Sequence, residues 1–291
     1  MTILINQDTR VLVQGITGSV GAFQTKIMLE YGTKLVAGVT PSKGGTLFEG
    51  IPVFNDVEKA VAETAPNAAI CFVPAKFARD AALEVIQTAI PLLVLTTEGV
   101  PEKDMLEILA YARIKGTRIV GPDTPGIISP GVSKLGVHPG LMYQKGTVGL
   151  VSKSGALSYE VGRVMTAAGI GQTTVVGIGG GPVWGSTQRE MVGLFYDDPE
   201  TQAVVLLGEV GGRMELDAAE FIRTHPGKPV IAMIVGRSAP EGAQMGHAGA
   251  IIEGHKGTAQ GKIEALKAAG TYIATKPREI PDLLREVGIK A

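Results

Sequence analysis

Short apolar runs alternate with amphipathic stretches along the first half of the chain. Brief buried runs bounded by turn residues are typical of strands, and apolar residues three or four positions apart are typical of helices. The predicted strands are residues 10–14, 34–39, 69–73, 92–96 and 117–120, and the predicted helices are 22–31, 77–87 and 104–114. Because strands and helices alternate, we expect a parallel sheet with right-handed crossovers.

Residues 121–140 are rich in Pro and Gly, the usual composition of a domain boundary. After them the alternation of short apolar runs and amphipathic stretches begins again. The predicted strands are 147–151, 173–178, 203–207 and 229–235, and the predicted helices are 157–168, 187–195, 215–224 and 262–269. We therefore predict an α/β protein with an N-terminal Rossmann-like domain at 1–122, a linker region at 123–145, and a flavodoxin-like parallel α/β domain at 146–291.

Charge and composition exclude several classes of partner. The formal net charge is −1, from 27 basic and 28 acidic residues spread along the chain, so we expect no binding to nucleic acid or to an anionic membrane. No apolar stretch approaches the roughly 18 residues that span a bilayer, and no export signal is evident, so we expect a soluble, cytoplasmic chain. The single cysteine, Cys71, lies in an apolar run and cannot form an internal disulfide, which allows a reducing compartment.

A glycine turn follows the first predicted strand and opens the first helix. Residues Gly15 to Gly21 read G-x-x-G-x-x-G, whereas nicotinamide-binding turns read G-x-G-x-x-G. Backbone amides at a helix start suit a pyrophosphate, although a tight turn without a ligand explains the glycines about as well. After the second strand a dinucleotide binder places an acidic residue on the ribose, but this chain has Lys43. Lys43 argues against an NAD-dependent dehydrogenase and favours a ligand that carries a phosphate on its ribose, as coenzyme A does. The alternative that Lys43 is a solvated loop residue without a ligand stays open.

His247 is the strongest candidate nucleophile, because its neighbours Gly246, Ala248 and Gly249 leave its ring open to close approach. The pKa of an unperturbed imidazole is about 6.5, so a large share of it is neutral at pH 7. Glu209 follows the third strand of the second half, and a carboxylate there can fix the tautomer of a histidine. A loop histidine without a role and a solvated loop glutamate remain the alternatives.

Ser154 and Gly155 stand where the first strand of the second half gives way to a helix. Unpaired amides at that point attract an anion, so the pair predicts a phosphate cradle. An ordinary N-cap serine is an equally simple explanation, whereas a nucleophile elbow is disfavoured because G-x-S-x-G is absent. The remaining histidines, 138, 225 and 255, show no familiar metal spacing, so we expect no metal site on this chain.

Residues 245–252 resemble the phosphohistidine loop of the succinyl-CoA synthetase (succinate–CoA ligase) alpha subunit family. The resemblance runs from Ile3 to about Leu284 without an evident insertion or deletion. It implies that His247 is phosphorylated, that Glu209 contacts it, and that Tyr159 binds the acid substrate. It further implies that Ser154 and Gly155 hold the phosphoryl group. The implied coenzyme A contacts are Gly15, Thr17, Gly18, Ser19, Val20, Lys43, Thr96, Thr97 and Glu98.

The resemblance also implies an activity and a partner. The activity is that of an acid–thiol ligase, which interconverts succinate or a similar organic acid, coenzyme A and ATP or GTP with the acyl-CoA, ADP or GDP, and phosphate. The nucleotide and its Mg²⁺ are expected on an ATP-grasp beta subunit, in an alpha-beta or alpha2-beta2 assembly. The histidine loop is expected to carry the phosphoryl group to the acid.

The sequence departs from the family pattern near the expected acid site. It has Asp123-Thr124 where the family commonly has Asn-Cys, lacks an aspartate between Gly181 and Pro182, and carries Trp184 nearby. An aspartate at this place should repel a second carboxylate at short range. A ligase for malate or another acid therefore remains an alternative, as does a non-catalytic paralogue that binds coenzyme A.

Overall fold

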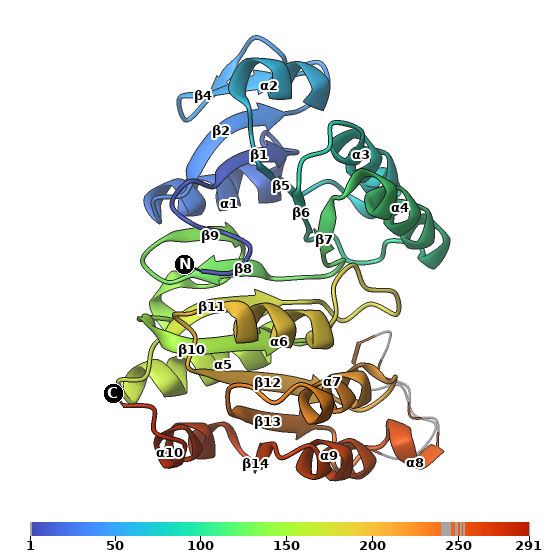
Figure 1. The fold of residues 1–291 in the computed structure, drawn as a ribbon. Helices are drawn as coiled ribbons and strands as arrows, with labels where there is room; N and C mark the ends of the chain where they lie inside the picture. Colours follow the sequence, from blue (N-terminus) through green and yellow to red (C-terminus); the bar gives the residue numbers. More distant parts are fainter. Residues whose placement is uncertain (1, 240–245, 248–249, 251, 253, 291) are drawn as a thin grey trace. The chain divides into compact units, whose positions relative to one another are not determined.

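The computed structural model describes residues 2–239, 246–247, 250, 252 and 254–290. The chain forms two compact units (Figure 1). Leu4–His138 and Val183–Ser186 make up the N-terminal unit, and Met1–Ile3, Pro139–Pro182 and Thr187–Ala291 make up the C-terminal unit. Each unit is a layered α/β structure around a mainly parallel sheet, which confirms the predicted fold class.

The N-terminal unit is built on a sheet with the order β3-β4-β2-β1-β5-β6-β7. Its strands are β1 (Arg10–Gln14), β2 (Lys34–Val39), β3 (Leu47–Phe48), β4 (Ile51–Phe54), β5 (Ala68–Cys71), β6 (Leu92–Leu95) and β7 (Arg118–Val120), and its helices are α1 (Ser19–Glu30), α2 (Val57–Thr64), α3 (Ala75–Gln87) and α4 (Glu102–Lys115). Only the β3–β4 pair in this sheet is antiparallel. Without β3, the strands follow the order 3-2-1-4-5-6 of the Rossmann fold.

The chain adds β2 on one side of β1 and later adds β5 on the other side of β1. The direction of the strand order therefore reverses between β1 and β5, and this is the topological switch point of the sheet. The glycine turn occupies this point. Gly15 has a φ of +75°, and a Cβ on Gly21 would lie 2.1 Å from the carbonyl oxygen of Gly15. These two glycines therefore allow α1 to start directly against the end of β1.

The C-terminal unit has its own parallel sheet in the order β14-β13-β12-β10-β11. Its strands are β10 (Lys145–Ser152), β11 (Gln172–Gly177), β12 (Ala203–Glu209), β13 (Val230–Val235) and β14 (Tyr272–Ala274), and its helices are α5 (Gly155–Ala167), α6 (Gln188–Asp197), α7 (Met214–Thr224), α8 (Gly254–Gly257), α9 (Ala259–Ala268) and α10 (Ile280–Glu286), with short 3-10 turns η1 (Gly140–Met142) and η2 (Pro277–Glu279). In chain order the strands run 2-1-3-4-5, as in flavodoxin, so the switch point lies between β10 and β12.

Helices cover both faces of this second sheet: α7 packs between α6 and α9, while α5 packs with α10 (Figure 1). Strands β11 and β12 are buried along their whole lengths, which is expected of parallel strands covered on both sides. The parallel pairing of β10 with β12 places their carboxyl ends beside one another.

A β-hairpin, β8 (Gly126–Ser129) and β9 (Ser133–Gly136), lies within the predicted linker region and was not expected from the sequence. The backbones approach closely at its open end, where a Cβ on Gly126 would lie 2.0 Å from the carbonyl oxygen of Leu135. Glycines whose composition indicated a domain boundary therefore permit strand pairing here. Among the described residues, no helix has the length and apolar character needed to cross a membrane.

Candidate active site

Two charged side chains meet at the switch point between β10 and β12. Lys153 follows β10 directly, and Glu209 is the last residue of β12; their exposed fractions are 2% and 6%. The Nζ atom of Lys153 lies 3.0 Å from Oε1 of Glu209. Because the two strands are neighbours in the sheet, their ends bring together residues that are far apart in the sequence.

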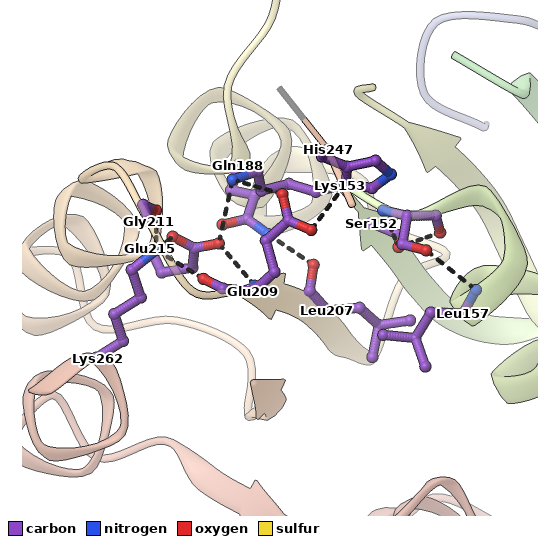
Figure 2. A network of polar contacts seen from close by, with 11 residues as sticks. Ser152, Lys153, Leu157, Gln188, Leu207, Glu209, Gly211, Glu215, His247 and Lys262 are labelled. Carbon is purple, nitrogen blue, oxygen red and sulfur yellow. Dashed lines mark hydrogen bonds and ion pairs between the residues drawn. The ribbon is translucent and has the colours of Figure 1, made fainter. Parts of the chain in front are cut away.

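His247 completes this group, as Figure 2 shows. Its Nδ1 lies 2.7 Å from Oε2 of Glu209, and its side chain is 30% exposed. An ionised carboxylate only accepts hydrogen bonds, so Nδ1 donates the proton and the lone pair of the neutral ring lies on Nε2. The predicted contact between His247 and Glu209 is thus present, and it selects one tautomer.

The charge of Glu209 is set by opposing effects. Burial raises the pKa of its carboxyl group, but the hydrogen bond from His247 and the ammonium of Lys153 more than offset this, so that the pKa lies below its usual value. Glu209 is therefore an anion at neutral pH although it is nearly buried. An anion at this place stabilises a positive charge on the imidazole ring.

The backbone of Glu209 is held by a second, fully buried ion pair between Glu215 on α7 and Lys262 on α9 (Figure 2). The amide of Glu209 donates to Oε1 of Glu215 at 3.1 Å, and Nζ of Lys262 donates to the carbonyl oxygen of Glu209 at 2.7 Å. Lys262 also donates to the carbonyl oxygen of Gly211. Glu209 is thus fixed through its amide, its carbonyl and both carboxylate oxygens.

The ring of His247 packs directly on Gly180, three residues beyond β11. A Cβ on Gly180 would lie 2.4 Å from Cδ2, 2.5 Å from Cγ and 2.9 Å from Nδ1 of the imidazole. No real side chain fits at such distances, so the absence of a Cβ at this position makes room for the ring. Gly208 does the same for Glu215, whose Cγ would be 2.6 Å from a Cβ at that position.

Helix α5 begins two residues after Lys153, which places its N-terminus at the same switch point. Ser154 is its N-cap and accepts a hydrogen bond from the amide of Leu157 at 3.3 Å, so the capping interpretation of this serine is confirmed. The amides of Gly155 and Ala156 lie in the first turn, where no helix carbonyl can accept their hydrogen bonds. Tyr159 lies one turn further along, half-buried, and burial raises the pKa of its hydroxyl group.

The predicted coenzyme A residues all lie in the N-terminal unit, at the carboxyl ends of β1, β2 and β6. Thr17, Gly18, Ser19, Val20, Lys43 and Glu98 are exposed there, and Gly15 is half-buried. The hydroxyl of Thr96 donates to the carbonyl oxygen of Cys71 at 2.7 Å, and that of Thr97 donates to Val73 at 2.8 Å. The structure thus gathers these residues at one edge of the sheet, the edge at which such folds bind ligands.

Of the residues that depart from the family pattern, Asp123, Thr124 and Trp184 belong to the N-terminal unit, whereas Gly181 and Pro182 belong to the C-terminal unit. Asp123 has a φ of +56°, and its amide donates to the carbonyl oxygen of Thr97 at 3.0 Å. The amide of Gly185, next to Trp184, donates to the carbonyl oxygen of Gly121 at 2.8 Å. Asp123 and Gly185 are therefore held near the ends of β6 and β7 within the N-terminal unit.

Two further histidines lie outside the candidate site. His138 is buried in the N-terminal unit, where burial lowers the pKa of its ring to about 3, and its Nε2 lies 3.1 Å from the carbonyl oxygen of Gly126. His225 is exposed and stacks on Phe221 at 4.3 Å between ring centroids. Of the family-like loop, residues 242–245, 248, 249 and 251 lie outside the described residues.

Sequence reasoning missed Lys153, Glu215, Lys262 and Gly180. A signal existed for two of them. Glu215 shares helical spacing with Ala218, Ala219 and Ile222, and Lys262 shares it with Ala259, Ile263 and Leu266, so that both charged residues lie on the buried faces of their helices. A charged residue on an apolar face indicates a buried partner of opposite charge.

Comparisons with known proteins match two separate parts of the chain to family models. Residues 6–99 match the family model of a CoA binding domain, and residues 151–272 match that of a CoA-ligase. The chain is 50% identical to a succinate–CoA ligase [ADP-forming] subunit alpha from Aquifex aeolicus, over 99% of this chain and 95% of that protein. It is 52% identical to the protein of the same name from Methanothermobacter thermautotrophicus, over 99% of this chain and 98% of the relative.

Among solved structures, the chain resembles an ATP citrate lyase from Methanosaeta concilii in complex with (3S)-citryl-CoA, with a TM-score of 0.88 and 25% identity. The match covers 99% of this chain, which spans about half (52%) of the length of that protein. Identity near 50% over almost the full length of two relatives is decisive for the family. This chain belongs to the succinate–CoA ligase alpha subunit family.

Proposed function

We propose that this chain is the alpha subunit of an ADP-forming succinate–CoA ligase and that His247 is its phosphorylated residue. The observation that carries the proposal is the 2.7 Å contact between Nδ1 of His247 and the ionised Glu209, at the switch point of a parallel sheet. The names of the relatives support succinate as the acid and ADP as the nucleotide product. They give no support to a malate ligase or to a non-catalytic paralogue.

In the first step, Nε2 of His247 attacks the γ-phosphorus of ATP, and the bond from that phosphorus to the oxygen of ADP breaks. The ring becomes positively charged, because Nδ1 keeps its proton. Glu209 accepts the hydrogen bond from Nδ1 and stabilises this charge. The amides of Gly155 and Ala156 at the start of α5 hold the oxygens of the phosphoryl group, to which the positive end of the helix dipole is attracted.

In the second step, a carboxylate oxygen of the acid attacks phosphorus and the P–N bond breaks, which returns a neutral ring and gives an acyl phosphate. The thiol of coenzyme A then attacks the acyl carbon, loses its proton, and displaces phosphate. Tyr159 is the residue proposed to bind the acid. The exposed residues after β1, β2 and β6 are proposed to bind coenzyme A, which places the acid-activating and thiol-binding residues in different units of one chain.

The alpha-subunit names of the relatives imply a second subunit. We assign the nucleotide and its Mg²⁺ to an ATP-grasp beta subunit, in an alpha-beta or alpha2-beta2 assembly. In the described part of this chain, no group of three or more His, Cys, Asp or Glu residues is placed to hold a metal ion. Cys71 is a free, buried thiol, which is compatible with a reducing compartment, and we propose the cytoplasm.

The test is phosphoryl labelling. The chain is mixed with an ATP-grasp beta subunit of proven competence and with ATP labelled in its γ-phosphoryl group. The expected product is a labelled chain whose phosphate is lost in acid and retained in base, and the label should leave on addition of succinate and coenzyme A. A beta subunit that labels another alpha subunit but never this one would overturn the proposal.

Replacement of Gly180 by Ala is expected to slow labelling by about 10²-fold, because a displacement of the reacting group by about 1 Å has an effect of this size. The new Cβ would lie 2.4 to 2.9 Å from the imidazole, so the ring has to leave its place against Glu209. Gly193→Ala is the matched control, because a Cβ there meets its nearest neighbour at an ordinary 3.5 Å. Equal labelling rates for the two variants would exclude contact between Gly180 and the reactive ring.

Replacement of Lys43 by Met is expected to raise the KM for coenzyme A by about 5- to 10-fold, the size of one exposed charge-assisted hydrogen bond. The KM for dephospho-coenzyme A should stay unchanged, because the proposed partner of Lys43 is the 3′-phosphate. Lys115→Met is the control: this lysine ends α4 and lies at the opposite edge of the sheet. If both cofactors lose affinity equally, Lys43 contacts some other part of coenzyme A.

A further inference from the structure

Lys153 is a buried cation for which the proposed chemistry has no step. Its side chain is 1% exposed, and its Nζ lies 3.0 Å from Oε1 of Glu209 and 3.9 Å from Oε1 of Glu215. An ammonium group loses much hydration on burial, so a lysine at this place is costly unless the charge has a use or a close partner. Glu209 is that partner, and its other carboxylate oxygen faces His247 (Figure 2).

The charged groups around Glu209 come from four segments of the described structure, and its sheet neighbour β13 places the apolar Val235 opposite it. The β10–α5 turn contributes Lys153, α7 contributes Glu215, α9 contributes Lys262, and His247 approaches from the chain before α8. Helix α6 contributes only the neutral Gln188, whose amide donates to the carbonyl oxygen of Leu207 at 2.9 Å. The two lysines balance the two glutamates, so the cluster is neutral overall when the imidazole is neutral.

The two lysines have different tasks in this arrangement. Lys262 pairs with Glu215 and donates to the backbone of Glu209, so its contacts fix where the end of β12 lies. Lys153 contacts the carboxylate itself. Nδ1 of His247 donates a hydrogen bond to Glu209, so the two side chains titrate as one unit. This pair can accept a phosphoryl group when it carries one proton, on Nδ1, and cannot do so once it carries a second proton.

We propose that Lys153 is a positioning residue that acts through Glu209 and sets the lowest pH at which the His247–Glu209 pair accepts a phosphoryl group. A fixed positive charge beside the pair opposes the second proton, wherever in the pair that proton binds. It also holds Oε1 of Glu209, so that Oε2 stays directed at the ring. The inference rests on the proposed function, because it concerns the same phosphoryl transfer.

The experiment compares the initial rate of labelling between pH 5.5 and 9 for the wild-type chain and for Lys153→Met, each with the beta subunit. The acid limb is the part of the profile in which the labelling rate falls as the pH is lowered. Removal of an opposite charge at this distance shifts a pKa by about 1–3 units, so the acid limb of Lys153→Met should lie at a pH higher than that of the wild type by this amount. Lys153→Arg keeps the cation and should return the limb to within a few tenths of a unit of the wild-type position.

Lys228→Met controls for lost stability. Lys228 is a half-buried lysine of the same unit that donates to the carbonyl oxygens of Phe195, at 2.7 Å, and Asp198, remote from Glu209 in the hydrogen-bond network. Its replacement should lower the melting temperature and leave the acid limb in place. A wild-type chain without any label would defeat the proposed function. A labelled wild type whose acid limb coincides with that of Lys153→Met would overturn the inference about Lys153 alone.

Discussion

A His247→Asn chain is expected to form no phosphoenzyme and to lose the complete ligase reaction by at least roughly 10³-fold, because the nucleophile itself is removed. Asparagine is similar in length to Nδ1 of the imidazole and can still donate to Glu209, whose Oε2 lies 2.7 Å from that nitrogen. It has no nucleophilic nitrogen, since its amide lone pair is delocalised. The variant therefore removes the chemistry and keeps the hydrogen bond.

The measurement is labelling with γ-labelled ATP and the beta subunit, followed by the complete reaction with succinate and coenzyme A. His225→Asn is the matched control, because His225 is an exposed histidine of the same unit that stacks on Phe221. The control should label at the wild-type rate. A label that persists in His247→Asn would move the phosphorylated residue elsewhere in the chain.

A Glu209→Gln chain is expected to label about 10²- to 10⁴-fold more slowly, with the binding of coenzyme A unchanged. Glutamine has the shape of glutamate but lacks the charge that stabilises a positive ring. Its amide can also donate to Nδ1, which would select the tautomer with the proton on Nε2 and remove the nucleophile. The loss should therefore appear in the rate of phosphoryl transfer, not in nucleotide affinity.

Stability must be measured alongside, because Glu209→Gln leaves the ammonium of Lys153 buried beside a neutral group. Breaking a buried ion pair in this way costs about 3–5 kcal/mol. Glu220→Gln on α7 is the control: that carboxylate pairs with Arg223 at the surface and its side chain is 62% exposed. Labelling should be compared below the melting temperature of every variant. An unchanged rate in folded Glu209→Gln would leave the carboxylate without a part in the reaction.

Most of the fold was predictable because its strands are buried runs between amphipathic helices. The strand at Lys34–Val39 was predicted to the residue, and α3, α4 and α7 were predicted within two residues at either end. The elements missed are short or rich in turn residues: β3, β4, α2, β14, α8, α10, the two 3-10 turns and the β8–β9 hairpin. Two-residue strands have no period to detect, and the glycines of the hairpin have the composition of a linker.

The site was predictable in part, for a different reason. The chemistry of His247 and Glu209 made them candidates, but their contact was expected only from the family resemblance, and the structure brings the two side chains together. Lys153 stood between two serines and had no period that marked it as buried. Gly180 was visible only as one glycine in a run, because its importance depends on a ring brought to it from a distant segment. Tertiary contacts of this kind leave no local pattern in the sequence.

The buried contacts that hold Glu209 also have a consequence for the folding of the C-terminal unit. Glu209 is joined to His247 across 38 positions of sequence and to Lys262 across 53. Lys153 can reach Glu209 only once β10 has paired with β12. Contacts of such high sequence separation form late and slowly, since the entropy of closing each loop is lost before the contact stabilises it. We therefore expect the contact between His247 and Glu209 to form late in the folding of the C-terminal unit, so that partly folded chains lack the arrangement proposed to accept the phosphoryl group.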